Sequence, residues 1–518
     1  MILGEVFERN AAHYGQLPAI YYEDRVVTHA EFLNRAYRLG NALQNLGACK
    51  QDRVLILAQN CPEFLELNCA CSLTGLISVG LNYRLAAGEQ LHIVNDCLPA
   101  VWIFEEQYAE RVAEICEKLS SVPQLICIGR QNAKDGYDYD ELLAQSSCNK
   151  PSLRAVEQDI VFLVYTSGTT GHPKGVMQTH AAQIEQAKIT SNACAATPID
   201  RVLMVMPFYH AGAPNIYLGY AWAGASVVLL RAFDVSLIYA NFSRHRVTAA
   251  LLAPVMIQML LDAPEEIRNG PNYLSSIFYS SAPMPVPLLK RGIAQFGSIF
   301  AQAYGMTECL VGSFMYKHQH RLDGAPDEVK RLASAGQPYF GCNIVVRRLD
   351  GSACEVGEVG EVTINSPAIM HGYWNNMQAT LSAIRDGWYF TGDLGYFDKE
   401  HYLFVVDRKK DMIISGGENI YSREVEEALL THPSVFETAV IGIPDEKWGE
   451  SVMAFVVCRN GKPGANELIE HCRMQIGSYK KPKVIEFVEA LPRVASTNKI
   501  DKKALRAPYW NLDQRAGI

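Results

Sequence analysis

The sequence predicts an α/β protein with a large N-terminal domain of stacked α/β layers, a β-rich subdomain and a small α+β C-terminal domain. From about residue 30 to about residue 400, short apolar runs typical of buried strands alternate with amphipathic helical windows. This alternation favours largely parallel sheets covered by helices. Beyond about residue 340 strands become more frequent, and a charged segment at 407–411 precedes a compact final unit. We therefore predict one domain at 1–409 and a second, mobile domain at 410–518.

The elements of the first domain are expected in a regular order. Apolar runs predict strands, and the apolar spacing of two longer windows predicts helices. The strands are expected at 54–57, 101–104, 124–128, 160–164, 203–206, 226–230, 249–253 and 276–280, and the helices at 30–46 and 286–296. The β-rich subdomain should contain strands at 357–364 and 402–406.

The C-terminal domain should begin with a helix that Ser422 caps and that buries Val425, Ala428 and Leu429 on one face. Pro433 follows this helix closely, and proline cannot continue a helix. Strands are then expected at 438–443, 452–457 and 484–488. One helix followed by several strands is typical of a small α+β unit.

The composition is that of an ordinary globular protein with a large core. Of the 518 residues, 49% are hydrophobic and 20% are charged, and the net charge of −8 argues against general nucleic-acid binding. The 14 cysteines are scattered without a CxxC pair, which predicts free thiols in a reducing cytoplasm. The acidic start of the chain predicts no signal peptide. Polar residues and helix breakers interrupt the uncharged runs at 67–83 and 202–230, so we expect core rather than transmembrane segments there.

The most informative motif is the glycine- and hydroxyl-rich segment 165–175, which follows the strand expected at 160–164. Its glycines allow the backbone to turn and to approach a ligand closely. Its hydroxyl groups and the Lys174 side chain supply hydrogen-bond donors and a positive charge. A strand followed by such a loop is typical of phosphate binding. It differs from the common P-loop because Gly175, rather than serine or threonine, follows Lys174. A flexible hairpin is the plainer alternative, which the lysine and the strand disfavour.

Six further motifs follow in a fixed order. Each is weak alone, because an aspartate near a turn or a lysine near a C-terminus is usually a solvated surface residue. They are 304–308 (Tyr-Gly-Met-Thr-Glu), 372–374 (Gly-Tyr-Trp), 389–393 (Tyr-Phe-Thr-Gly-Asp), 407–408 (Asp-Arg), 415–421 (Ser-Gly-Gly-Glu-Asn-Ile-Tyr) and 492–500 (Pro-Arg-Val-Ala-Ser-Thr-Asn-Lys-Ile).

Taken in this order, the motifs resemble those of the acyl-adenylate-forming superfamily, which includes acyl-CoA synthetases, aryl-CoA ligases, firefly-type luciferases and nonribosomal adenylation domains. The resemblance covers essentially the whole chain. It implies a large N-terminal domain over which a small C-terminal domain closes. It also implies a two-step reaction. A carboxylate attacks the α-phosphorus of ATP to give acyl-AMP and pyrophosphate, and a thiol then displaces AMP. The implied co-substrates are ATP and coenzyme A, and the implied metal cofactor is Mg²⁺.

The resemblance also assigns phosphate- and metal-binding roles to individual residues. The residues that should hold the β- and γ-phosphates are Thr166, Ser167, Gly168, Thr169, Thr170 and Lys174. Thr307 should contact the α-phosphate. Glu308 should hold magnesium, a hard cation suited to carboxylate and phosphate oxygens, and Ser167 is a further candidate ligand.

The nucleoside and the reacting carboxylate have their own implied partners. Tyr304 should stack on adenine. The residues expected around the adenine with Tyr304 are Ala303, Gly305, Ser281, Ala282 and Pro283. Asp393 should bind the ribose hydroxyls, assisted by Arg408. Lys499 should bridge the attacking carboxylate and the α-phosphate, where charge develops.

The acid and the thiol have implied sites as well. His210 should line the acid pocket and gate the approach of the thiol, although a lone histidine is more often structural. The residues expected to form the pocket with it are Tyr209, Ala211, Ser280 and Ser281. The turn expected to face the pantetheine channel is Ser415, Gly416 and Gly417. Lys410 occupies the hinge position, about which the C-terminal domain is implied to turn after adenylation.

Three departures from the family pattern bear on pocket shape. Asn498 stands where glycine usually precedes the mobile lysine, and asparagine tolerates left-handed backbone angles better than most residues. In 279–283 (Tyr-Ser-Ser-Ala-Pro), a serine hydroxyl stands where glycine is common. Ala303 replaces the usual glycine before Tyr304.

Three functions are compatible with these motifs. The first is a CoA ligase acting on an aromatic or a medium- to long-chain fatty monocarboxylic acid, because no lysine or arginine is clearly placed for a second carboxylate. The second is a stand-alone adenylation enzyme that transfers the acyl group to a carrier protein or an amine. The third is a non-catalytic nucleotide-binding relative, which the full set of motif residues disfavours. The expected partners are small molecules, not nucleic acid, and the sequence permits a homodimer.

Overall fold

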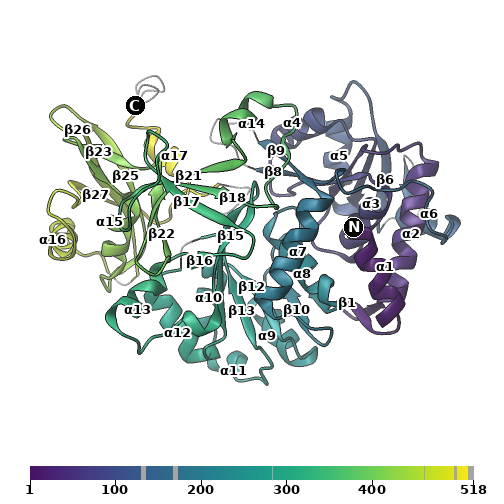
Figure 1. Ribbon diagram of the computed structural model, residues 1–518, viewed down its shortest axis with the longest axis horizontal. Helices are drawn as coiled ribbons and strands as arrows, with labels where there is room; N and C mark the ends of the chain where they lie inside the picture. Colours follow the sequence, from purple (N-terminus) through teal and green to yellow (C-terminus); the bar gives the residue numbers. More distant parts are fainter. Residues whose placement is uncertain (130–135, 167–172, 283, 460, 495–498, 511–518) are drawn as a thin grey trace. The chain divides into compact units, whose positions relative to one another are not determined.

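The computed structural model describes residues 1–129, 136–166, 173–282, 284–459, 461–494 and 499–510 (Figure 1). It confirms the mixed α/β class predicted from the sequence. By internal contacts the chain divides into two compact units. Unit 1 comprises residues 1–344 and 364–389, and unit 2 comprises residues 345–363 and 390–518. The expected division after residue 409 stays a prediction about where the small domain pivots.

An eight-stranded sheet forms one half of unit 1, in the order β19-β9-β8-β4-β3-β5-β6-β7. The pairs from β8 to β7 are parallel, whereas β9 and β19 join the edge in antiparallel fashion. The strands are β3 Arg53–Leu57, β4 Ile77–Gly80, β5 Val101–Glu105, β6 Gln124–Ile128, β7 Tyr137–Asp138, β8 Ile160–Thr166, β9 Lys174–Thr179 and β19 Gly372–Tyr373.

A nine-stranded sheet forms the other half, in the order β16-β15-β14-β13-β12-β10-β11-β1-β2. It is parallel from β14 to β1 and antiparallel at both edges. The strands are β1 Pro18–Tyr22, β2 Arg25–Thr28, β10 Arg201–Met204, β11 Ser226–Leu229, β12 Ala249–Leu252, β13 Ser276–Tyr279, β14 Phe300–Met306, β15 Leu310–Met315 and β16 Gln337–Pro338.

Helices cover both faces of these sheets. Five of them share one buried apolar cluster with both sheets: α1 Leu3–Tyr14, α2 His29–Asn45, α3 Pro62–Thr74, α7 His180–Cys194 and α8 Gly212–Ala223. Figure 1 shows α7 beside α8 and α1 beside α2. On the outer face of the eight-stranded sheet lie α4 Ala87–Cys97 and α5 Ala109–Cys116. On the outer face of the nine-stranded sheet lie α9 Val235–Arg244, α10 Pro254–Leu261 and α12 Val286–Phe296. These layers confirm the predicted stacked arrangement.

The remaining helices of unit 1 are short. They are α6 Tyr139–Gln145, α11 Glu265–Arg268, α13 Pro326–Lys330, α14 Met377–Ala383 and the 3₁₀ turns η1 Glu106–Tyr108, η2 Lys317–Gln319 and η3 Arg331–Ala333. The uncharged runs at 67–83 and 202–230 belong to α3 and β4, and to β10, α8 and β11, and these elements are buried. Within the described ranges, no helix has the length and apolar character that crossing a membrane would need.

Unit 2 carries most of a five-stranded sheet in the order β17-β18-β21-β20, with β22 also paired to β21. Its strands are β17 Asn343–Arg347, β18 Gly360–Asn365, β20 Ile384–Arg385, β21 Trp388–Phe397 and β22 Leu403–Arg408. A second sheet has the order β24-β23-β26-β25, with β27 also paired to β26. Its strands are β23 Ile413–Ser415, β24 Glu418–Ile420, β25 Val435–Asp445, β26 Gly449–Cys458 and β27 Val484–Phe487, and the helices are α15 Ser422–Leu430, α16 Ala465–Gln475 and α17 Lys502–Arg506.

The start of α15 differs from the sequence prediction. Ser422 is the first helical residue and not the cap, because Tyr421 occupies the N-cap without a side-chain hydrogen bond. The Asp407 carboxylate, from the end of β22, accepts the Ser422 backbone N–H instead. The Ser422 hydroxyl also donates to Asp407, at 3.1 Å. An aspartate distant in the sequence thus performs the capping that a local serine was predicted to perform. The predicted buried face, Val425, Ala428 and Leu429, is confirmed.

Candidate active site

Strands β8 and β9 form an antiparallel hairpin whose tip is the predicted phosphate loop. Thr166 at the end of β8 faces Lys174 at the start of β9, and the Thr166 hydroxyl lies 3.5 Å from the Lys174 carbonyl oxygen. Ser167, Gly168, Thr169 and Thr170 lie outside the described residues, so their predicted contacts stay predictions. The hairpin therefore brings one predicted hydroxyl and the predicted phosphate lysine together at one edge of the sheet.

Residues next to the tip of this hairpin are held by contacts with Asp96 and Trp374. The Tyr165 hydroxyl donates to Asp96 Oδ2 at 2.6 Å, and the Trp374 indole N–H donates to the Asp96 carbonyl at 3.1 Å. The Trp374 backbone N–H donates to the Gly175 carbonyl at 2.7 Å. A Cβ atom on Gly175 would lie 2.9 Å from Leu163 Cδ1 and 3.2 Å from Trp374 Cβ. Close packing, rather than an unusual backbone angle, therefore favours glycine at position 175.

The predicted adenine and α-phosphate motif lies at the end of β14 and in the turn that leads to β15. Tyr304 and Gly305 are the last part of that strand, and Ala303 precedes them. A Cβ atom on Gly305 would lie only 1.6 Å from the Leu310 carbonyl oxygen, so a side chain cannot fit there. The turn thus depends on glycine, and it sets the direction in which Thr307 and Glu308 leave the strand.

Two segments hold this turn against β9. The Gln178 side chain on β9 donates its Nε2–H to the Thr307 carbonyl at 2.6 Å. The Met370 backbone N–H donates to the Glu308 carbonyl at 2.7 Å, and the Tyr373 hydroxyl donates to Glu308 Oε1 at 2.9 Å. The predicted α-phosphate and magnesium residues are therefore tied to the strand that carries Lys174.

Tyrosine side chains surround the Glu308 carboxylate. Lys174 Nζ lies 5.2 Å from the centre of the Tyr373 ring, within the range of a cation–π contact. Tyr389 lies beside Tyr373, and both tyrosines adjoin Glu308. Burial raises the pKa of both tyrosines, and the neighbouring Glu308 carboxylate raises it further. Both hydroxyl groups are therefore protonated donors at neutral pH.

The predicted acid pocket is built after β10. The Gly212 backbone N–H donates to His210 Nδ1 at 3.2 Å, so the neutral imidazole carries its proton on Nε2. Tyr209 is buried and Ala211 is half-buried. A Cβ atom on Gly80 would lie 2.8 Å from Tyr209 Cα. The backbone at Tyr209 therefore packs directly against Gly80 in the eight-stranded sheet.

The other predicted wall follows β13. The Ser280 and Ser281 hydroxyls are 3.5 Å apart, and Ala282 is exposed. Pro283 lies outside the described residues. Ser281 has φ of +72°, which costs a non-glycine residue roughly 1 kcal/mol or more. Ser281 is therefore held under backbone strain.

A small cavity of about 20 Å³ lies beside the predicted acid pocket. Tyr209 and Ala211 line it together with residues that the sequence did not single out: Phe64, Asn68, Ser78, Gly80, Phe162, Leu163, Val164, Gln178, Gln183, Phe208, Pro214 and Leu310. The wall is apolar except for the amide and hydroxyl side chains of Asn68, Ser78, Gln178 and Gln183. A glutamine next to the apolar Val176 and Met177 of β9 was the available sequence signal for Gln178.

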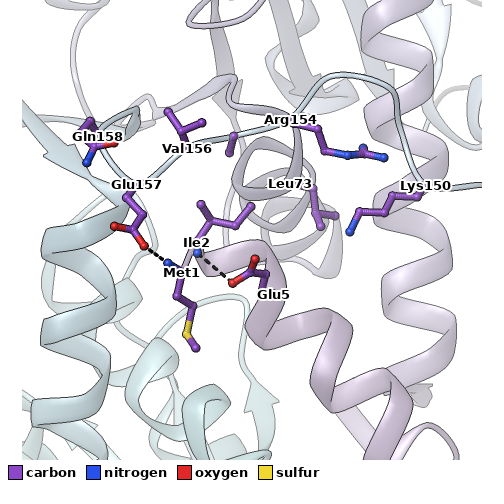
Figure 2. A pocket seen from close by; sticks show the side chains of 10 residues that line it. Met1, Ile2, Glu5, Leu73, Lys150, Arg154, Val156, Glu157 and Gln158 are labelled. Atoms are coloured by element: carbon purple, nitrogen blue, oxygen red, sulfur yellow. Dashed lines mark hydrogen bonds and ion pairs between the residues drawn. The ribbon is translucent and has the colours of Figure 1, made fainter.

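A second cavity, of about 360 Å³, opens at the start of α1 (Figure 2). Its lining comprises Met1, Ile2, Glu5, Leu73, Lys150, Arg154, Ala155, Val156, Glu157 and Gln158, and includes none of the predicted site residues. Figure 2 shows the Glu157 carboxylate pointing toward the Met1 nitrogen, with which it forms an ion pair. Lys150 pairs with Glu8. We assign this cavity no ligand, because its lining includes none of the predicted site residues.

The predicted ribose site lies within unit 2. Asp393 on β21 faces Arg408 on β22 in the strand register, and Arg408 Nε lies 2.7 Å from Asp393 Oδ1. Asp393 is buried, whereas Arg408 is about half exposed. The Asp393 backbone N–H donates to Thr391 Oγ1 at 3.0 Å. The carboxylate is therefore held in a fixed position with its cation on the exposed side.

The glycine turn between β23 and β24 has the backbone that its sequence requires. Gly416 and Gly417 have φ of +62° and +85°, a region that favours glycine. A Cβ atom on Gly416 would lie 2.6 Å from the Trp448 ring, and the Gly416 N–H donates to the Trp448 carbonyl at 2.7 Å. Ser415 ends β23. The turn is thus rigid, with Trp448 packed directly on it.

Lys410 and Lys499 are both exposed on unit 2. The Val494 N–H donates to the Lys499 carbonyl at 2.8 Å, which closes a loop whose residues 495–498 lie outside the described part. Buried charges adjoin Lys410. Lys502 Nζ lies 2.7 Å from Glu426 Oε1, and Arg506 pairs with Asp411.

Family models match most of this chain. A model described as AMP-binding enzyme matches residues 7–374, and one described as AMP-binding enzyme C-terminal domain matches residues 424–498. The chain belongs to the family of AMP-binding enzymes. This confirms the superfamily indicated by the motifs.

Named relatives of this AMP-binding enzyme extend over nearly its whole length. It is 34% identical to feruloyl-CoA synthase of Amycolatopsis sp. over 98% of this chain and 99% of that protein. It is 33% identical to long-chain-fatty-acid–CoA ligase FadD13 of Mycobacterium tuberculosis, over 93% of each. The solved structure of o-succinylbenzoate CoA synthetase (MenE) of Bacillus subtilis, in complex with an acyl-adenylate intermediate, superimposes with a TM-score of 0.85 at 32% identity. That match covers 96% of this chain and 97% of the MenE chain.

The residues of this AMP-binding enzyme fit a magnesium ion shared with a nucleotide. Mg²⁺ is commonly held by one or two carboxylates together with substrate phosphates. Glu308 offers one carboxylate beside Lys174, and the described part of the chain contains no cluster of three or more potential metal ligands. The donor set therefore suits a metal that arrives with its triphosphate rather than one in a protein cage.

Proposed function

We propose that this protein is an AMP-forming carboxylic acid–CoA ligase that converts a monocarboxylic acid, ATP and coenzyme A into acyl-CoA, AMP and pyrophosphate. The family models and the full-length CoA ligase relatives support this function. The observation that carries it is the grouping of Lys174, Thr307 and Glu308 around β9, through Gln178 and Tyr373. A nucleotide triphosphate needs such a cation, hydroxyl and carboxylate at one place.

In the proposed first half-reaction, a carboxylate oxygen bonds to the α-phosphorus of ATP, and the bond from that phosphorus to the bridging oxygen breaks. Lys174 and the Thr166 hydroxyl hold the departing pyrophosphate. Glu308 would hold a magnesium ion, which when bound would supply positive charge to neutralise the triphosphate. Thr307 and Lys499 stabilise the α-phosphate as its charge redistributes. Positioning and charge neutralisation account for most of the catalysis in such phosphoryl chemistry.

In the proposed second half-reaction, the CoA sulfur bonds to the acyl carbon, the bond to AMP breaks, and the thiol proton leaves to solvent. The turn at Gly416 and Gly417 forms one side of the path for pantetheine. His210, whose Nδ1 accepts a backbone hydrogen bond, gates the acyl carbon with its Nε2 side. Lys410 is the hinge between the two arrangements.

We further propose that the preferred acid carries a hydrogen-bond donor on an otherwise apolar, compact body. Gln178 is 1% exposed, and its Nε2 faces the Thr307 carbonyl, which can only accept. The amide oxygen, Oε1, therefore points away from Thr307. That oxygen has no hydrogen-bond partner among the described residues. A purely alkyl chain against it would leave a buried acceptor unsatisfied, at roughly 1–3 kcal/mol. A hydroxy- or amino-substituted aryl acid would satisfy it.

Matched substrates test both parts of the proposal. Pyrophosphate release would be measured with benzoate and hydroxybenzoates, cinnamate and hydroxycinnamates, and octanoate and hexadecanoate, each with and without CoA. The hydroxylated member should have the higher kcat/KM, by roughly 10-fold. Gln178→Leu should remove that preference, and because it also removes the hydrogen bond to the Thr307 carbonyl it should lower kcat/KM for all the acids together. Preference for hexadecanoate would contradict the substrate class, whereas release of pyrophosphate with none of the acids would contradict the ligase function.

A cytoplasmic location is proposed from the cysteines. All fourteen are free thiols, and most are buried. An oxidising compartment would favour disulfides or expose such thiols to oxidation.

A further inference from the structure

The 372–374 motif (Gly-Tyr-Trp) has no role in the proposed reaction so far, yet it lies at the centre of the nucleotide residues. Strand β19 pairs with β9 so that Tyr373 lies opposite Val176. Side chains alternate along a strand, so Lys174, Val176 and Gln178 leave the same face of β9. The Tyr373 side chain therefore shares the sheet face that carries the predicted phosphate lysine.

The Tyr373 side chain has two different contacts there. Its hydroxyl donates to Glu308 Oε1 at 2.9 Å. Its ring faces Lys174, with Nζ 5.2 Å from the ring centre. One residue thus contacts both the predicted metal carboxylate and the predicted phosphate cation, which are 134 positions apart in the sequence.

Tyr389 lies beside the Tyr373 hydroxyl, and burial followed by the nearby Glu308 carboxylate raises the pKa of Tyr389. Tyr373 and Tyr389 are 8% and 5% exposed, so the Tyr373 hydroxyl is enclosed by protein. Its hydrogen bond to Glu308 therefore fixes the orientation of that carboxylate.

We propose that Tyr373 is a positioning residue for the magnesium–ATP complex: its hydroxyl orients the Glu308 carboxylate and its ring holds Lys174. The inference rests on the proposed roles of Glu308 and Lys174. A neutral partner suits this task, because a cation paired with Glu308 would compete with the metal. Residues that orient a metal ligand typically change metal affinity by 10- to 100-fold.

Two substitutions separate the hydroxyl from the ring. Tyr373→Phe removes only the donor to Glu308, and Tyr373→Leu removes the face that Lys174 contacts as well. Equilibrium binding of ATP would be measured by calorimetry at saturating Mg²⁺ and in excess EDTA. Tyr373→Phe should weaken binding about 10-fold with Mg²⁺ and leave binding in EDTA unchanged. Tyr373→Leu should also weaken binding in EDTA, by about threefold.

Kinetics and two control variants complete the test. The Mg²⁺ concentration that gives half-maximal pyrophosphate release should rise about 10-fold in Tyr373→Phe, and by less in Tyr389→Phe, because Tyr389 lies behind the Tyr373 hydroxyl. Tyr239→Phe is the matched control, because this buried tyrosine donates to the Leu260 carbonyl at 3.1 Å on another face of unit 1. It should lose stability without any change in Mg²⁺ dependence.

Two results would overturn the inference. One is an unchanged Mg²⁺ dependence in Tyr373→Phe. The other is equal weakening with Mg²⁺ and with EDTA, which would make Tyr373 a merely structural residue. If the wild-type protein bound no ATP at all, the proposed function would fail rather than this inference.

Discussion

Two regions, the surroundings of β9 in unit 1 and of Lys410 in unit 2, surround their charged side chains differently. Around β9 in unit 1, Glu308 meets tyrosine hydroxyls and Thr307 meets a glutamine amide, and Lys174 lies over an aromatic ring. Beside Lys410 in unit 2, cations and carboxylates are paired with one another: Lys502 with Glu426, and Arg506 with Asp411. The hydrogen bonds described around β9 come from neutral groups, whereas the charges beside Lys410 compensate one another in ion pairs. The comparison teaches where to look for a binding site and where to look for a structural brace.

The pKa shifts in unit 2 agree with a structural role. Burial raises the pKa of Asp407 and of Glu426. At Asp411 burial acts in the same direction, but the Arg506 guanidinium outweighs it and lowers the pKa of that carboxyl. Glu426 and Asp407 therefore depend on Lys502, and Asp411 depends on Arg506. Asp407 also caps α15. The network fixes the start of the small domain next to the predicted hinge.

Removing a cation from the unit 2 network should have the largest effect on stability. Lys502→Met should lower the free energy of unfolding by about 3–5 kcal/mol, because Glu426 and Asp407 would keep buried, uncompensated charge. Urea unfolding measures this. Lys480→Met is the matched control: Lys480 pairs with the partly exposed Glu424 at 2.7 Å, and its loss should cost under about 1 kcal/mol. Equal losses in both variants would contradict a special role for the buried network.

A lysine outside that network should behave differently. Lys499→Ala should slow acyl-AMP formation by about 10³-fold, because the charge that develops at the α-phosphate would lose its partner. It should leave thioester formation from supplied acyl-AMP largely intact, and it should leave the urea midpoint unchanged. The two half-reactions would be followed separately, by pyrophosphate release and by consumption of CoA thiol. A comparable loss in both would remove Lys499 from the adenylation step.

Acid should weaken unit 1 through buried histidines. Burial lowers the pKa of His180 and of His320 to about 4. Above pH 6.5 both are neutral in the folded and the unfolded chain. Between pH 6.5 and about 4 the unfolded chain binds protons that the folded chain cannot, so the free energy of unfolding falls, by about 3 kcal/mol per histidine at pH 4. Urea midpoints across this range measure the loss.

A substitution at one histidine tests whether that histidine causes the loss of stability in acid. His320→Gln should reduce the slope of unfolding free energy against pH by about one proton between pH 6.5 and 4. His13 is the matched control position, because it is exposed on α1, and His13→Gln should leave the slope unchanged. A wild-type stability that did not vary in this range would refute buried neutral histidines in unit 1.

The smallest expected effect concerns strain in the predicted acid pocket. Ser281→Gly should stabilise the protein by up to about 1 kcal/mol, because glycine adopts the positive φ without strain. Ser280 has no positive φ, so Ser280→Gly should instead destabilise by about 0.5–1 kcal/mol. Thermal unfolding of the two variants measures opposite shifts. Two shifts of the same sign would mean that backbone strain does not decide the outcome.

Local patterns predicted the elements and the motif residues. The strand at 124–128 and the helix at 286–296 have the predicted limits, as β6 and α12. Lys174 and Glu308 were selected from motifs, and the structure brings them to the two sides of Tyr373.

Long-range contacts could not be predicted in the same way. The Gln178–Thr307 and Tyr373–Glu308 hydrogen bonds join segments 129 and 65 positions apart, and no periodicity in a sequence specifies such pairs. Ser422 shows the same limit, because a local serine met the rule for a cap while Asp407, 15 positions away, took that place. A local preference gives way when a charged acceptor from another element can reach the same N–H.

The attachment of Trp374 to Asp96 has a consequence for the newly made chain. This hydrogen bond spans 278 positions, and β19 joins β9 about 200 residues after β9 itself has been synthesised. The hairpin that carries the phosphate loop therefore emerges from the ribosome long before its brace. Domains are made N-terminus first, so the predicted nucleotide residues of unit 1 reach their final arrangement only when translation has passed residue 374. A chain that ended before residue 374 would contain the predicted phosphate loop but would lack the Trp374 hydrogen bond to Asp96.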